Sequence, residues 1–198
     1  KIAVIYDTEN RDLSAEFLIY TSKYIIKAGG IEGLRVCNSQ PPYPKALLPA
    51  LGLIYDIYKE QTDKHLPDCF DDYDLTYAYE LIRNDETCRK SDIKTFFDCA
   101  AFLISITEDE MKQYALKNLK NAESEYEFNI RCINKELIIG TKDIIFGLLH
   151  DIKKGMQAEI MAAKFYKSVI DFSVFLCKDL RELYGISKAE LIGDMFIE

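Results

Sequence analysis

The feature that most constrains the fold is the apolar pattern that runs from Thr141 to the end of the chain. Apolar residues recur there at helical spacing as far as Gly155, and again over a longer stretch as far as Gly185. Glycine directly after the last periodic residue is typical of a helix end. A short apolar strand follows and runs into Gly193. The pattern therefore predicts an amphipathic helix that Thr141 caps, a long second helix and a strand.

The first third of the chain reads as strands. An apolar, β-branched run over residues 2–6 ends at Asp7 and predicts a buried strand. Residues 17–21 and 24–27 then predict a hairpin, closed at Gly29-Gly30. A helix over residues 16–28 is the alternative, because the same stretch also has helical spacing.

The middle of the chain reads as helices. The proline-rich stretch from Pro41 to Pro44 is extended, because proline restricts both its own φ and the residue before it. Apolar spacing then predicts helices over residues 45–59, 75–83 and 92–106. Thr107 and Glu110 have the spacing of a capping box, which opens another helix to about residue 121. Alternation over residues 125–133 predicts an antiparallel strand.

This order of elements predicts one helix-dominated α/β domain over residues 1–198. We expect N-terminal strands over 1–35, a helical middle over 44–122, and a strand-helix-helix-strand end over 125–198. A chain of 198 residues with 48% apolar residues can bury a sizeable core.

Composition excludes several classes of function. A net charge of −8 argues against a nucleic-acid-binding or anionic-membrane-binding surface, which relies on clustered Lys and Arg. No window approaches the run of about 20 apolar residues that a membrane span needs. The six cysteines form no Cys-x-x-Cys, and we expect reduced thiols such as Cys99 and Cys177 on apolar helix faces. With no secretory signal, the expected compartment is the reducing cytoplasm.

The last strand continues as Ile192-Gly193-Asp194-Met195-Phe196-Ile197-Glu198. It is similar to the S-G-G-V-F-Q-N strand of the HypF-type carbamoyltransferases, which mature nickel–iron hydrogenases and are related to the enzymes that make threonylcarbamoyl-adenosine in tRNA. Other segments resemble the carboxy-terminal region of that family in the same order. Asp7 stands where the family has D-G-T-G-Y-G, and Glu16-Phe17-Leu18 match the end of W-G-G-E-F-L. Phe97-Asp98 match the F-D of S-S-M-G-R-L-F-D-A, and Ala162 to Tyr166 match A-x-x-F-H with Tyr166 in place of histidine.

The resemblance implies the second lobe of an actin/Hsp70-like ATPase, which is a ribonuclease H-like fold. It also implies that Asp7, Glu16, Asp98 and Gly193 would line the remnant of a nucleotide cleft. If the chain were an active enzyme, it would be a carbamoyltransferase that uses ATP, carbamoyl phosphate and a metal ion.

The departures from the family lie in its phosphate-binding turns. Glycine lets backbone N–H groups approach a phosphate closely, but Thr8, Glu9, Asn10 and Asp194 stand in place of the family's glycines. At about 4 Å and an effective dielectric of about 20, each like-charge pair costs about 4 kcal/mol before screening. We therefore expect a degenerate lobe that needs no cofactor and acts as a binding or assembly module, with a protein partner or a second copy of itself.

Metal sites are not expected. The printed sequence holds no counterpart of the family's paired metal-binding histidines, and His65 and His150 lie in no metal-binding motif. Each is expected to have a surface or helix-end role. The acidic residues between Asp68 and Asp74 lack the spacing of a calcium loop and predict a solvated loop.

Two enzyme alternatives stay open. In the first, the chain is part of a two-lobe ATP-dependent carbamoyltransferase. In the second, it is a metal-dependent NYN/PIN-like ribonuclease, with Asp7 and Glu9 at a strand end and Asp92 and Asp98 as later ligands. The competing interpretation is a solvated turn at residues 7–10 and an Asp98 that faces water or bonds a neighbouring helix end. No G-x-S-x-G or similar nucleophile motif is present.

Overall fold

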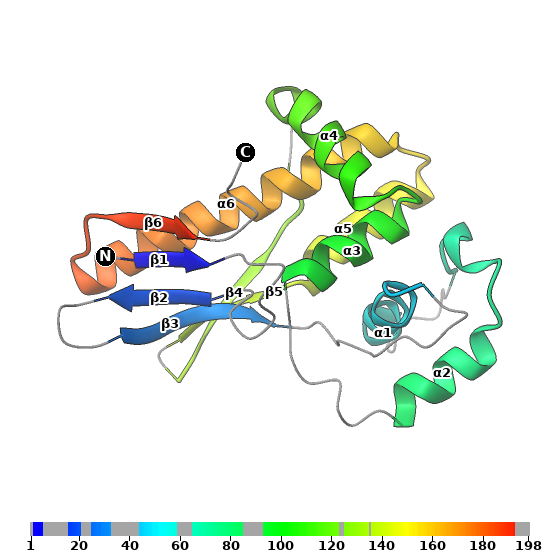
Figure 1. Ribbon diagram of the computed structural model, residues 1–198, viewed down its shortest axis with the longest axis horizontal. Helices are drawn as coiled ribbons and strands as arrows, with labels where there is room; N and C mark the ends of the chain where they lie inside the picture. Colours follow the sequence, from blue (N-terminus) through cyan, green and yellow to red (C-terminus); the bar gives the residue numbers. More distant parts are fainter. Residues whose placement is uncertain are drawn as a thin grey trace.

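A mixed sheet and a set of helices make up the chain, and the longest helix runs from one to the other (Figure 1). The computed structural model describes residues 2–5, 16–20, 25–32, 44–58, 65–84, 93–122, 125–134 and 136–192. The strands are β1 (Ile2–Ile5), β2 (Glu16–Tyr20), β3 (Ile25–Glu32), β4 (Asn129–Ile133), β5 (Glu136–Gly140) and β6 (Ala189–Ile192). The helices are α1 (Leu47–Tyr58), α2 (Leu75–Asn84), α3 (Ile93–Leu103), α4 (Glu108–Asn118), α5 (Lys142–Lys153) and α6 (Ala158–Tyr184), with short 3-10 turns at Asp68–Phe70 and Leu119–Asn121.

This is the helix-dominated α/β class that the sequence predicted. Within the described residues, no helix combines the length and the apolar character that a membrane span requires.

The sheet has the order β4-β5-β3-β2-β1-β6. β1, β2 and β3 pair antiparallel, β6 adds parallel to β1, and β5 adds parallel to β3. The hairpin of β2 and β3 is confirmed, and the alternative helix over residues 16–28 is wrong. Gly29 and Gly30 do not close the hairpin but lie inside β3, where they pair with Phe17 and Glu16. The register shifts beside this pair, and glycine in a strand commonly marks such a bulge.

A second hairpin, β4 and β5, corrects the prediction for residues 125–133. The strand begins only at Asn129, and β5 was not predicted at all. Ile133 pairs with Glu136, so the loop is two residues long, and Asn134 has a φ of 52°. Asparagine tolerates this left-handed conformation, which two-residue hairpin loops require.

The helix ends follow the predicted local signals, with one exception. Thr107 and Glu110 form the capping box of α4, in which each side chain accepts a hydrogen bond from the other residue's N–H group. Gly185 ends α6 with a φ of 65°, a conformation in which glycine has no Cβ to clash. Thr141 precedes α5, but its side chain makes no capping bond and is fully buried. Its backbone is already helical there, whereas a capping side chain requires an extended backbone.

The core lies between the helices. α1 is buried over residues 47–54, and it packs on α3 and α5. Phe165 of α6 meets two rings of α3, with centroids 4.8 Å from Phe96 and 5.2 Å from Phe97. Aromatic pairs at such distances add to the free energy of burial. Cys99 is fully buried among these residues, as predicted for a core thiol.

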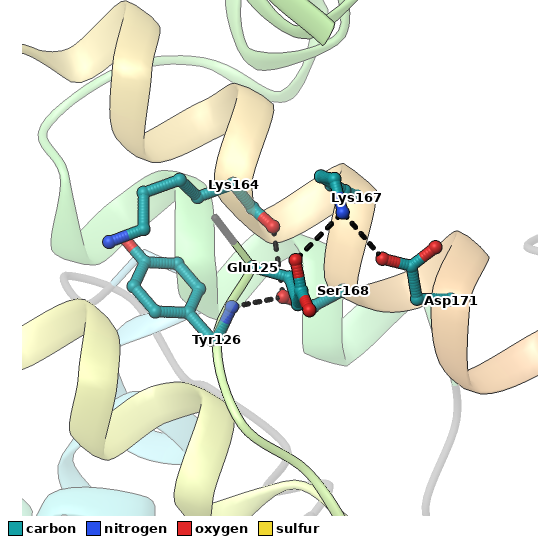
Figure 2. A network of polar contacts seen from close by, with 6 residues as sticks. All are labelled: Glu125, Tyr126, Lys164, Lys167, Ser168 and Asp171. Carbon is teal, nitrogen blue, oxygen red and sulfur yellow. Dashed lines mark hydrogen bonds and ion pairs between the residues drawn. The ribbon is translucent and has the colours of Figure 1, made fainter. Parts of the chain in front are cut away.

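A polar network fixes the segment before β4 to α6 (Figure 2). The Tyr126 backbone N–H donates to Ser168 Oγ over 2.7 Å, and the Ser168 hydroxyl donates to the Lys164 carbonyl over 2.9 Å. Beside it, the Lys167 ammonium lies 2.7 Å from Glu125 and 2.8 Å from Asp171. The bond to Ser168 satisfies the backbone N–H of Tyr126, which lies outside the described strands.

Candidate functional site

The carboxyl ends of β1 and β6 lie side by side at one end of the sheet. The two strands are parallel, and Ile5 of β1 pairs with Ile192 of β6. Glu16 pairs with Ile5 from the other side, so its backbone lies at the same end. In Figure 1 the arrows of β1 and β6 both point toward the part of the molecule that holds α3 and α5. Asp7 and Gly193 follow these two strand ends in the sequence, and both lie outside the described residues.

The other residues predicted for the phosphate-binding turns, Thr8, Glu9, Asn10 and Asp194, also lie outside the described residues, as does Asp92. The described parts of the strands place Glu16 at the expected end of the sheet. The predicted nucleotide cleft itself stays a prediction.

Asp98 is the one predicted site residue whose side chain the structure describes. It lies on α3, one turn after Lys94, and its Oδ1 is 3.0 Å from the Lys94 ammonium. The same ammonium lies 2.5 Å from Glu108 Oε2 at the start of α4. Asp98 is therefore a half-buried member of an ion-pair group that Lys94 extends from α3 to the start of α4, and its role in a nucleotide cleft stays a prediction.

Tyr166 of α6 completes this group. Its ring lies 5.1 Å from that of Phe97, centroid to centroid. Burial raises the pKa of Tyr166, and the carboxylate of Glu108 raises it further. Asp98 and Tyr166 are far apart in sequence, yet the structure brings both to one place. We call Lys94, Asp98, Glu108 and Tyr166 the Lys94 cluster.

The pKa values of the Lys94 cluster shift in different directions relative to neutral pH. Burial lowers the pKa of Lys94, but hydrogen bonds to Glu108 and Asp98 outweigh it and leave the pKa above its ordinary value. For Glu108, burial raises the pKa more than the neighbouring Lys94 ammonium lowers it. A general base needs a pKa near the working pH; the pKa values of Lys94 and Tyr166 are shifted away from neutral pH, whereas that of Glu108 is shifted toward it.

The net charge of the Lys94 cluster also disfavours phosphate. One ammonium faces two carboxylates when both acids are ionised, and both carboxylates already bond it. Phosphate sites instead present unpaired cations or free backbone N–H groups. The arrangement is suited to holding α3 and α4 together beside α6.

A more deeply buried ion pair was not expected from the sequence. Asp151, near the end of α5, pairs with Lys164 of α6, and their side chains are only 7% and 14% exposed. The Lys164 ammonium also lies 4.5 Å from the centre of the Tyr126 ring, toward which its side chain extends in Figure 2. Burial raises the pKa of the Tyr126 hydroxyl, and the nearby Asp151 carboxylate raises it further. This buried hydroxyl has no hydrogen-bond partner among the described residues. The sequence signal was weak, because both charges lie within amphipathic helices where solvent exposure is the usual outcome.

His65 and His150 are both exposed, as predicted for residues with a surface or helix-end role, and both line one cavity. Across the described ranges, no three His, Cys, Asp or Glu residues come together as a possible metal site. Asp68, Asp71, Asp72 and Asp74 are all exposed, as predicted, and Asp74 accepts the Thr76 N–H over 3.0 Å at the start of α2.

Known proteins match this chain only through its fold. No family model matches the sequence, and neither does any curated protein sequence. A crystal structure of full-length HypF in the phosphate- and nucleotide-bound form superposes on 98% of this chain with a TM-score of 0.77 and 20% sequence identity. The chain spans about a third of that protein, since the match covers 32% of it. The resemblance to HypF predicted from the sequence is thus confirmed at the level of the fold.

Proposed function

We propose that this chain is a degenerate second lobe of the HypF type and acts as a binding or assembly module. The superposition on part of HypF supports this assignment. The strand order in the sheet supports an actin/Hsp70-like ATPase lobe. β3, β2 and β1 pair antiparallel, and β6 lies beside β1 and parallel to it. Fold similarity does not transfer the carbamoyltransferase activity, which depends on the site.

The observation that carries the proposal is the exposure of large apolar side chains on α6 and β6. These side chains are 39–67% exposed, and they are Ile170, Val174, Phe175, Leu183, Tyr184, Leu191 and Ile192. We call this set the α6–β6 surface. On α6 these side chains lie on several sides of the helix at 3.6 residues per turn, so the set does not form a single helix face. Large apolar side chains exposed on a folded domain nevertheless commonly mark protein interfaces.

The position of β6 adds to this argument. Among the described strands, β6 pairs only with β1, so it is the last described strand on that side of the sheet. An edge strand with apolar residues can pair with another chain. The proposal is therefore association through the α6–β6 surface, with a second copy or with a chain that supplies a first lobe.

Light scattering of the purified chain at micromolar concentration tests self-association. We expect a mass above that of the monomer, and Leu183→Lys should lower it because it places a charge in the interface. Leu116→Lys is the matched control, since Leu116 is 57% exposed but lies on α4. A strict monomer, or equal effects of the two substitutions, would count against self-association through this surface.

The alternative is a two-lobe carbamoyltransferase that handles ATP and carbamoyl phosphate, for which Asp7, Glu16, Asp98 and Gly193 would line the cleft. The position of Glu16 beside the ends of β1 and β6 is the observation in its favour. Calorimetry with ATP and Mg²⁺ separates the two proposals. No heat and no thermal stabilisation at millimolar ATP would support the module, whereas clear binding would favour the enzyme. The nuclease alternative predicts instead that Asp7→Ala abolishes RNA cleavage while the fold survives.

A further inference from the structure

One side of α6 carries four charged residues of alternating sign. They follow one another at intervals of four, seven and four residues, and they are Lys167, Asp171, Lys178 and Glu182. At 3.6 residues per turn, these intervals keep the four residues within about 60° of one another around the helix axis. We call this set the α6 charge row.

Two large apolar side chains lie at the midpoint of the α6 charge row. Val174 and Phe175 are on the same side of α6, and each is 46% exposed. Leu176 and Leu180, which point to the opposite side of the helix, are buried in the core. The open side of α6 thus has an apolar centre with charges at both ends, which is the usual composition of a protein interface.

The charges of the row are accessible to a second chain. Figure 2 shows the Lys167 ammonium between Glu125 and Asp171, and the Asp171 side chain is still 40% exposed. Exposed pairs of this kind contribute little to stability, so Asp171 can accept a further cation. Lys178 and Glu182 are both exposed, and neither has an ion-pair partner in the part of the chain that the structure describes.

The α6 charge row is complementary to its own reversed copy. Lys167 and Glu182 are equally far from the point between Val174 and Phe175, and so are Asp171 and Lys178. A second α6 that runs in the opposite direction about this point therefore places its Asp171 beside Lys178. The same arrangement places its Lys167 beside Glu182. A parallel pair in register would instead bring like charges together, which disfavours association.

We propose that two copies of this chain associate by antiparallel packing of their α6 helices, with Val174 and Phe175 at the centre and the α6 charge row around them. The charges favour a second copy as the occupant, because a two-fold interface requires a surface that is complementary to itself. This inference rests on the proposed role in assembly. It narrows the α6–β6 surface to one side of α6.

Sedimentation equilibrium of the full chain at micromolar concentration tests the proposal. Lys178→Glu and Asp171→Lys each bring like charges together, and the two-fold symmetry repeats this contact twice in the dimer. Each substitution should raise the dissociation constant of the dimer about tenfold. Lys45→Glu is the matched control, since it makes the same change of charge at an exposed lysine before α1, which packs on α3 and α5. It should leave the dissociation constant unchanged.

An equimolar mixture of the Lys178→Glu and Asp171→Lys chains tests the direction of packing. In a mixed dimer both contacts again join opposite charges, so the affinity should return to near that of the unmodified chain. Lys167→Glu mixed with Glu182→Lys provides a second pair of the same design. Thermal unfolding of each variant shows whether its fold is retained.

The possible results separate this inference from the proposed role in assembly. A chain that stays monomeric overturns both the antiparallel pair and self-association through the α6–β6 surface. A chain that dimerises but responds equally to Lys178→Glu and Lys45→Glu overturns the antiparallel pair alone. So does a mixture that recovers no affinity, and in both cases association through another part of the α6–β6 surface still stands.

Discussion

The Asp151–Lys164 pair should be among the most sensitive polar contacts of the described core. Replacing Lys164 by methionine keeps much of the side-chain volume but leaves the Asp151 carboxylate buried without its cation. Breaking a buried pair in this way typically costs about 3–5 kcal/mol, because the remaining charge stays desolvated. A domain of this size is stable by only about 5–15 kcal/mol, so the loss would be a large fraction of the total.

The Lys94 cluster provides a matched control within the same chain. Lys94 also bonds carboxylates, but its side chain is 35% exposed and those of its partners are 25% and 34% exposed. Solvent screens such pairs, so Lys94→Met should cost no more than about 1 kcal/mol. For a chain of this length each kcal/mol lowers the melting temperature by about 2–4 °C, so Lys164→Met should lower it by roughly 6–20 °C.

Urea unfolding followed by circular dichroism at neutral pH measures these differences. The double variant Asp151→Asn, Lys164→Met should be more stable than Lys164→Met alone, because it removes the orphaned charge. The reasoning is refuted if Lys164→Met costs the same as Lys94→Met, or if the double variant recovers nothing. Either result would mean that water reaches Asp151 in the folded state.

Three further substitutions test local features by the same unfolding assay. Ser168→Ala should cost about 1–3 kcal/mol, because it leaves the buried Tyr126 N–H without an acceptor; a neutral effect would mean that water replaces the hydroxyl. Gly147→Ala should destabilise by about 1–3 kcal/mol, since the added Cβ would lie 2.6 Å from Cδ1 of the Tyr126 ring. Alanine otherwise stabilises a helix relative to glycine, so a gain in stability would contradict the close approach. Thr107→Ala should cost about 0.5–2 kcal/mol through loss of the α4 cap. Hydrogen bonds from the Thr107 N–H and hydroxyl lower the pKa of Glu110 in the folded chain. The ionised carboxylate therefore contributes stability above the ordinary glutamate pKa. This contribution is lost as the pH falls through the lowered pKa of the folded state. The difference between Thr107→Ala and the unmodified chain should therefore shrink in acid, and a difference independent of pH would argue against the capping box.

Much of the helical architecture could be predicted because its signals are local. The capping box at Thr107 and the glycine at Gly185 act on residues within one turn, so the sequence alone indicates where α4 begins and α6 ends. The apolar period of α6 likewise identifies the face that carries Phe165. The hairpin of β2 and β3 was also predictable, since its strands are neighbours in the sequence.

Strand β5 was not predicted, because local sequence signals do not distinguish it. Its apolar residues Leu137, Ile138 and Ile139 suit either a strand or a short buried helix, and the run is too short for periodicity to decide. Its parallel pairing with β3 joins residues more than 100 positions apart. Only the packed structure supplies that partner. The hairpin signal at Asn134 was nevertheless present in the sequence.

The sequence by itself determined the helix-dominated α/β class, the ends of the longest helices, and a resemblance that the fold of HypF bears out. The tertiary structure decided which distant side chains meet. It brought Asp98 and Tyr166 together through Lys94 and Glu108, buried Asp151 against Lys164, and placed His65 and His150 around one cavity. The physical reason is that helix propensity, capping and periodicity act within a few residues. Ion pairs and cavities instead depend on how whole helices pack, which no short window of the sequence specifies.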